Sequence, residues 1–194
     1  MKKKSLALVL ALAMIVVCVV GGTLAWLIDK TDPVTNTFTY GDINIKLEET
    51  DATVAADGSA TKEFKMIPGY TIAKDPKVTV LAGSEKCYLF VKVDKSANFD
   101  KFMTYDMAAD WIALDGVDGV YYRVVETSTA DQPFYVLAGN KVTVNDTVTK
   151  ADMNALNAEG ATQPTLTFTA YACQYNSSNG TNFTPAQAWA KVYP

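Results

Sequence analysis

Alternating hydrophobic and polar residues predict that most of this chain is β-strand. The alternation begins near Thr37, changes phase at Gly41-Asp42 and continues through Ile43, Ile45 and Leu47. A glycine inside a strand is typical of a bulge, so we expect one core strand over residues 37–48 that is kinked at Gly41. Further strands are predicted in KVTVLAGSEKCYLFVKVDK, DWIALDGVDGVYYRVVE, PFYVLAGNKVTV and PTLTFTAYACQ.

Glycine-containing turn signals separate these strands and suggest how they connect. We expect turns at residues 82–84 and 115–119, and a hairpin with Gly139-Asn140 at its tip. In PTLTFTAYACQ, alternate apolar residues from Leu166 to Ala172 share one face, which predicts a central strand. Many short strands at regular spacing favour an antiparallel β-sandwich.

Three short segments follow a helical pattern instead. Residues 98–109 carry apolar side chains at roughly helical spacing, which predicts a short helix. A capping-box pattern starts a second helix at Thr149, and Thr184-Pro185 starts a third near the end of the chain. The expected fold class is therefore all-β with short helices.

The first 28 residues have the pattern of an export signal. MKKK precedes an apolar run, and no charge occurs between Lys4 and Asp29. Thr23-Leu24-Ala25 fits a signal peptidase site, so we expect residues 1–25 to be a signal peptide that is cleaved between Ala25 and Trp26. The alternative is an uncleaved anchor over residues 5–28, because a bilayer is spanned by ~20 apolar residues.

Charge and composition exclude several classes of function. The net charge is −4, and removal of residues 1–25 with their three lysines would lower it to −7, which disfavours nucleic-acid binding. The chain contains no histidine, so zinc-peptidase motifs and Ser-His-Asp triads are absent. We expect no catalytic residues, no metal site and no cofactor.

The cysteines leave two alternatives open. Cys87 and Cys173 could form a disulfide in an oxidising medium if their strands were paired. Their neighbours differ, since Cys87 shares a face with Leu89 and Val91 whereas Cys173 shares one with Tyr171. This favours two separate, buried thiols over a disulfide.

Four segments together resemble the TasA/camelysin (CalY) family of secreted proteins from Gram-positive bacteria. They are GGTLAW, FTYGDINIKLEE, MIPGYTIAKDPKVTVLAGSEKCYLFVKV, and LTFTAYACQ followed by a late AW. The resemblance implies a jelly-roll sandwich, export through a leader cut by a SipW-like signal peptidase, and assembly into fibres of the biofilm matrix. In fibre-forming members the mature amino-terminal segment inserts as a strand into the neighbouring subunit.

Residues 26–36 have features that suit such a donor arm. Trp26, Leu27 and Ile28 are apolar, and their burial would contribute about 1.5–3 kcal/mol each. Pro33 would interrupt a strand ladder and act as a pivot before the sandwich domain, which we expect over residues 37–194. The alternative is that residues 26–36 fold back on their own sheet or fray.

The expected function is that of a secreted structural protein that polymerises head to tail in an extracellular matrix. Its expected partners are further copies of itself, a SipW-like signal peptidase and an accessory fibre-anchoring protein. One alternative is a cell-surface accessory protein that an uncleaved leader retains. Another is a camelysin-like peptidase, for which the sequence offers no histidine ligands.

Overall fold

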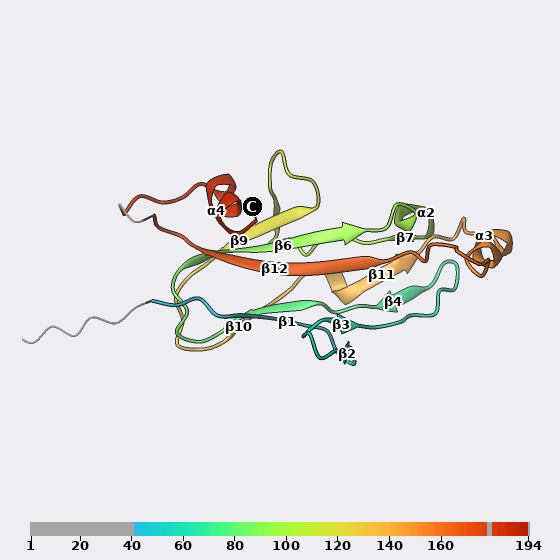
Figure 1. Cartoon of the computed structure of the whole chain (residues 1–194), viewed down its shortest axis with the longest axis horizontal. Coiled ribbons are helices and arrows are strands. Elements are labelled where there is room, and N and C mark those ends of the chain that lie inside the picture. Colours follow the sequence, from blue (N-terminus) through green and yellow to red (C-terminus); the bar gives the residue numbers. More distant parts are fainter. Residues whose placement is uncertain (1–40, 178–179, 194) are drawn as a thin grey trace, which may run out of the picture. The chain divides into compact units, whose positions relative to one another are not determined.

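The computed structural model describes residues 41–177 and 180–193, which form an all-β fold with short helices, as the sequence predicts. Twelve strands in this part of the chain make four sheets, and every pairing between them is antiparallel (Figure 1). No helix among the described residues is long and apolar enough to cross a bilayer.

One layer of the sandwich is a four-stranded sheet. Its order is β12 (Leu166–Gln174), β6 (Cys87–Lys95), β9 (Val120–Val125) and β8 (Ile112–Ala113). Strands β12 and β6 pair along nine residues, from Leu166 opposite Lys95 to Gln174 opposite Cys87. The hairpin predicted around residues 115–119 is confirmed, because β8 pairs with β9 across that turn.

The other layer consists of two three-stranded sheets that continue one another. The first contains β1 (Ile45–Glu48), β5 (Lys77–Val80) and β10 (Gln132–Tyr135), and the second contains β4 (Thr71–Ala73), β11 (Lys141–Val144) and β7 (Met103–Thr104). Strand β4 leads into β5, and β10 leads into β11. Together β4 and β5 form one long, irregular strand. Because β10 pairs with β5 and β11 pairs with β4, β10 and β11 form its long antiparallel partner.

The hairpin predicted at Gly139-Asn140 is therefore wrong. These residues lie in a 3₁₀ turn, Ala138–Asn140, with φ of 63° and 53° at Gly139 and Asn140. The turn makes a local bulge, after which the chain continues in its original direction along β4. Positive φ marks a sharp local bend, and only the register of the flanking strands decides whether that bend reverses the chain.

The strand order is that of a jelly roll. Followed around the two layers, the strands come in the order β1, β4–β5, β10–β11, β7, β8, β9, β6 and β12. This order matches two interlocked Greek keys. Among the described residues, no backbone pairing joins β7 to β8 or β12 to β1. A small extra hairpin, β2 (Thr53–Val54) with β3 (Ala60–Thr61), lies within the segment before β4.

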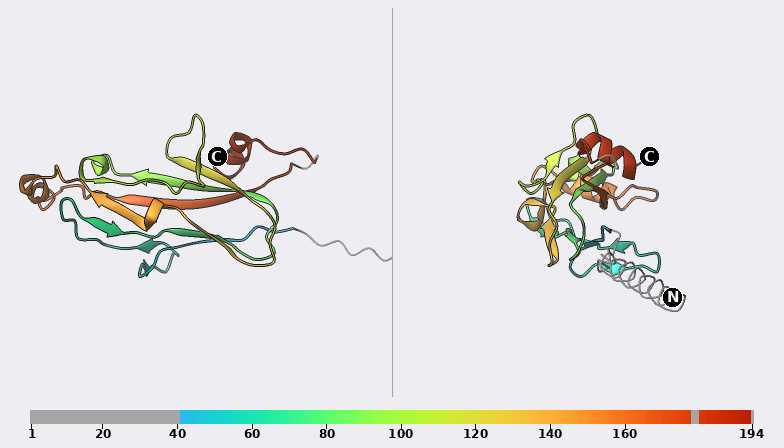
Figure 2. Two further views of the ribbon diagram at one scale, coloured as in Figure 1. Left: turned by 180° about the vertical axis from the view of Figure 1, so that it is seen from behind. Right: turned by 90° about the vertical axis from the view of Figure 1, so that its left-hand side faces the viewer.

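Apolar side chains are buried on both faces of the first layer. The inner core combines residues of both layers, including Val78, Val80, Leu89 and Val91, each at most 1% exposed. On the outer face α4 (Pro185–Val192) covers the sheet (Figure 2). Its Trp189 side chain packs against Phe90. This second cluster explains why almost all of β6 is buried.

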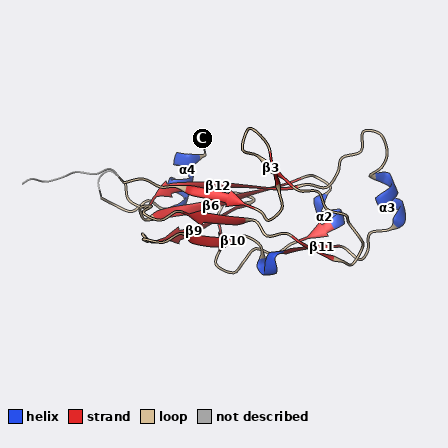
Figure 3. Ribbon diagram, turned by 90° about the horizontal axis from the view of Figure 1, so that it is seen from below, coloured by secondary structure: helices blue, strands red, loops and turns tan. Residues whose placement is uncertain are grey.

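The short helices occupy opposite ends of the sandwich, with α4 at one end and α2 (Phe99–Phe102) and α3 (Lys150–Ala155) at the other (Figure 3). The capping boxes predicted for α3 and α4 are present. The helix predicted over residues 98–109 is wrong beyond Phe102, because Met103 pairs with Val144 and Met107 bridges to Leu137 in antiparallel fashion. Long-range pairing overrides the helical spacing there.

Candidate functional site

Strand β12 lies at an open edge of its layer. The sequence predicts a central strand here, which is wrong within the described residues, because β12 pairs with β6 alone. In an antiparallel pair every second residue directs its N–H and C=O away from the partner strand. The outer edge of β12 therefore presents a row of backbone donors and acceptors that can bind a further strand.

Strand β1 lies beside this edge without pairing to it. It is the outer strand of its own layer, and it contacts β12 across the boundary between the two layers. Some of their Cα atoms approach within 8 Å, but no backbone hydrogen bond joins the two among the described residues. We call this boundary the seam and define it by Ile45 and Leu47 on one side and Leu166, Phe168 and Ala170 on the other.

The inner core is incompletely covered along the seam. All five defining residues point toward the inner core, yet each remains partly exposed. Their counterparts one strand further in, such as Val78 in β5 and Leu89 in β6, are fully buried. Among the residues that the structure describes, the seam thus combines unpaired backbone with incomplete burial of apolar side chains, and an added strand would complete both.

The sequence of β12 offers no protection against such addition. Edge strands are usually short, charged or interrupted by proline. Strand β12 is nine residues long and contains neither charge nor proline, whereas the opposite edge strand, β8, has two residues and is flanked by Asp110 and Asp115. Of the two edges of this layer, only the one at the seam is suited to binding a strand.

Insertion of a strand into the seam requires β1 and β12 to move apart. A strand that pairs with both neighbours needs two strand spacings, about 9.6 Å in total. The present separation is smaller, with Cα atoms within 8 Å. The seam is therefore closed in this state, and the contacts that hold it closed decide how readily a strand can enter.

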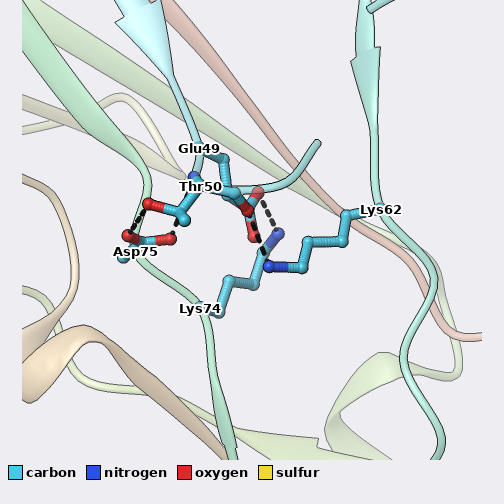
Figure 4. Close-up of polar contacts among 5 residues, drawn as sticks. All are labelled: Glu49, Thr50, Lys62, Lys74 and Asp75. Carbon is cyan, nitrogen blue, oxygen red and sulfur yellow. Dashed lines mark hydrogen bonds and ion pairs between the residues drawn. The ribbon is translucent and has the colours of Figure 1, made fainter. Parts of the chain in front are cut away.

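A polar cluster fixes the end of β1 to the loop between β4 and β5 (Figure 4). Lys74 Nζ donates to Glu49 Oε2 at 2.8 Å, and Lys62 Nζ donates to the carbonyl oxygen of Thr50 at 2.7 Å. Thr50 also donates to Asp75 through its hydroxyl at 2.6 Å and its N–H at 3.2 Å. The bond from the Thr50 hydroxyl lowers the pKa of Asp75 below its usual value.

Lys74 also contacts the other side of the seam. Its ammonium group lies 5.5 Å from the ring centroid of Phe168 in β12 and 5.3 Å from that of Phe64, distances at which cation–π attraction operates. The ion pair with Glu49 is largely buried, with the two side chains 12% and 14% exposed. Glu49 Oε1 is buried without a hydrogen-bond partner among the described residues, which costs about 1–3 kcal/mol.

Cys87 and Cys173 do not form a disulfide with each other. Both are free and buried, which agrees with the favoured prediction. Cys173 lies opposite Tyr88 rather than Cys87, so the two thiols point to opposite faces of the sheet, one into the inner core and one into the outer cluster. Burial raises the pKa of Cys87 to about 11, which leaves it as an unreactive thiol.

The residues that the sequence singles out for cleavage and assembly are not placed by the structure. Ala25, Trp26, Leu27, Ile28 and Pro33 all lie outside the described residues, as does the beginning of the strand predicted from Thr37. The predicted core positions Ile45 and Leu47 are confirmed within β1. The sequence does not reveal Glu49 and Lys74 as partners, because nothing local distinguishes them from other surface charges.

The chemistry available at the seam is that of strand binding. Within the described residues no group of His, Cys, Asp or Glu side chains could hold a metal ion. Backbone amides supply affinity in strand addition, and the alternating apolar side chains fix the register. No protein-family model, no curated protein and no solved structure matches this chain.

Proposed function

We propose that this protein is a secreted structural subunit of an extracellular matrix, and that its copies join by adding a strand of one copy to the seam of the next. The observation that carries the proposal is β12, a long, uncharged edge strand whose core-facing side chains are only partly buried. A surface of this kind favours pairing with another chain.

The segment best suited to fill the seam is the arm, residues 26–36 of a second copy. Trp26, Leu27 and Ile28 supply apolar side chains that could cover the partly exposed core residues of the seam. Pro33 cannot donate to a ladder, so it marks the point where pairing would stop. The resemblance to the TasA/camelysin family supports the same assignment.

Addition of this kind produces filaments. Each copy would carry one arm and one seam, which makes the contact heterologous and open-ended. In this proposal a SipW-like signal peptidase releases the arm by cleavage between Ala25 and Trp26, and an accessory protein anchors the fibre at the cell surface. The proposal assigns the chain no enzymatic activity and no cofactor.

The arm is tested by replacing Trp26, Leu27 and Ile28 with serine in the secreted protein. We expect the variant to remain folded and monomeric, because the substitutions remove only the apolar surface offered to another copy. Electron microscopy and light scattering measure the filaments. The control replaces Thr31, Thr35 and Asn36 of the arm with serine, which leaves its apolar residues intact and should leave filament formation unchanged.

Filaments of normal length from the arm variant would contradict the proposal. Amino-terminal sequencing of the same secreted sample tests the processing step, and Trp26 is the expected first residue. A chain that keeps residues 1–25 would instead favour a membrane-held accessory protein. Peptidase assays of the purified protein with and without a chelator test the absence of enzymatic activity.

A further inference from the structure

We propose that Lys74 acts as a clasp that holds the seam closed and thereby regulates strand addition. The regulatory part of this inference depends on the function proposed above, whereas the closing of the seam does not. The clasp consists of Lys74, Glu49 and Phe168, which belong to three different segments of the chain.

The clasp joins the two sides of the seam through one ammonium group. Lys74 Nζ bonds to Glu49, the residue directly after β1, and lies over the ring of Phe168 in β12. No backbone hydrogen bond between these strands shares this task within the described residues. Within the described part of the chain, the ion pair with Glu49 therefore fixes Lys74 on the β1 side, and the contact of its ammonium group with Phe168 links that side to β12 across the seam.

The clasp should open more easily than a fully buried ion pair in which every polar atom has a hydrogen-bond partner. Both charged side chains retain partial exposure, so water can solvate them when they separate. Glu49 Oε1 already lacks a partner among the described residues, so the acceptor capacity of this carboxylate is only half used in the closed state. An incoming strand brings backbone N–H groups that can satisfy this oxygen.

The position of the clasp decides which part of β12 is accessible. Phe168 lies near the beginning of the strand with the seam residues Leu166 and Ala170 on either side of it on the same face, whereas Ala172 to Gln174 lie beyond the seam. With the clasp closed, an arm can pair only with this distal part of β12. Opening of the clasp extends the available ladder to Leu166 and allows the full arm to bind.

The test measures opening of the seam directly by thiol labelling of the full chain. A reporter thiol is introduced at the seam by Ala170→Cys, at a position that is partly buried, and Cys173→Ala removes the nearby natural thiol. Fully buried Cys87 remains as an internal reference for global unfolding. Mass spectrometry follows the rate at which iodoacetamide modifies each thiol, with and without the double substitution Glu49→Gln and Lys74→Met.

Removing both charges avoids an unpaired buried charge, so the double variant should fold. We expect the reporter thiol to be labelled about tenfold faster in this variant while the labelling rate of Cys87 is unchanged. The matched control is Lys46→Met, which removes an exposed pair with Glu48 on the same strand and should leave both rates unchanged. Equal rates for the reporter thiol with and without the clasp, or a parallel rise for Cys87, would overturn the inference.

Filament growth is measured on the same substitutions in the chain with its natural Ala170 and Cys173. Faster growth in the double variant supports regulation by the clasp. Unchanged growth, despite faster labelling of the reporter thiol, would refute the regulatory role and leave the closing role intact. If labelling accelerates but no version of the chain forms filaments, the proposed function fails while the closing role of the clasp stands.

Discussion

Gly119 shows how one residue fixes the β8–β9 turn to the rest of the sheet. Its φ is +70°, and a Cβ atom there would lie 2.6 Å from the carbonyl oxygen of Val93 in β6. The carbonyl oxygen of Gly119 also accepts a hydrogen bond from Val93 N–H at 2.8 Å. Only glycine permits both the left-handed conformation and this close approach of two backbones.

Gly119→Ala should therefore destabilise the protein far more than the same change three residues earlier. Gly116 has a similar φ of +73°, but nothing lies within 4 Å of its would-be Cβ. We expect Gly116→Ala to cost about 1 kcal/mol from backbone strain alone. Gly119→Ala should cost roughly 3 kcal/mol or more, because a backbone clash adds to the strain. Urea unfolding measures both values, and equal losses would contradict this reasoning.

At the scale of elements, helix α3 depends on one ionised carboxylate. Asp152 accepts hydrogen bonds from the hydroxyl and the N–H of Thr149 and forms an ion pair with Lys101 at 2.6 Å. The hydrogen bond with Lys101 lowers the pKa of Asp152 most, and the hydrogen bonds from Thr149 lower it further, to well below its ordinary value of 3.8. The folded state therefore gains stability from this group above about pH 4 and loses it as the pH falls through the lowered pKa.

Acidification below about pH 4 should loosen α3 before the sheets unfold. Amide hydrogen exchange, expressed as protection factors for residues 150–155, measures this effect. Asp152→Ala should lower protection already at neutral pH and remove the additional loss on acidification. Glu159→Ala, a change at an exposed position just beyond the helix, is the control. A normal acid response of α3 in Asp152→Ala would show that another group is responsible.

Local sequence signals predict individual helices and strands better than they predict which strands lie next to one another. The capping boxes at Thr149 and Thr184 depend on residues three positions apart, and both predicted helix starts are confirmed. The spacing of Met103 and Met107 suggests a helix, but partners in distant β11 and Leu137 impose an extended chain. The uncharged pattern of β12 indicates a buried strand and cannot show that one neighbour is missing.

The same limit applies to the candidate site. Apolar alternation correctly identifies Ile45, Leu47, Leu166 and Phe168 as core-facing residues. Their placement on opposite sides of a seam follows from strand order, which depends on contacts far apart in the sequence. Lys74 and Glu49 are separated by 25 residues, so their pairing leaves no local pattern to detect.

At the scale of the whole molecule, the proposed assembly implies that a copy without a functional arm still possesses a seam. Such a copy can accept a strand but cannot donate one, so it should terminate a filament at one end. Mixing a small fraction of the Trp26, Leu27 and Ile28 serine variant into normal protein should shorten filaments markedly. Electron microscopy measures the length distribution. Unaltered lengths would show that copies do not join through an arm and a seam.

Trp111 and Trp189 are buried in different apolar clusters, which gives the protein an intrinsic fluorescence signal. Trp111 donates its indole N–H to the carbonyl oxygen of Tyr135 beside the inner core, whereas Trp189 stacks on Tyr193 in the outer cluster. The third tryptophan of the chain, Trp26, belongs to the arm. Fluorescence from Trp111 and Trp189 therefore reports on the two cores. In the proposed filament, burial of Trp26 would shift its emission to the blue and follow assembly in real time without any added dye.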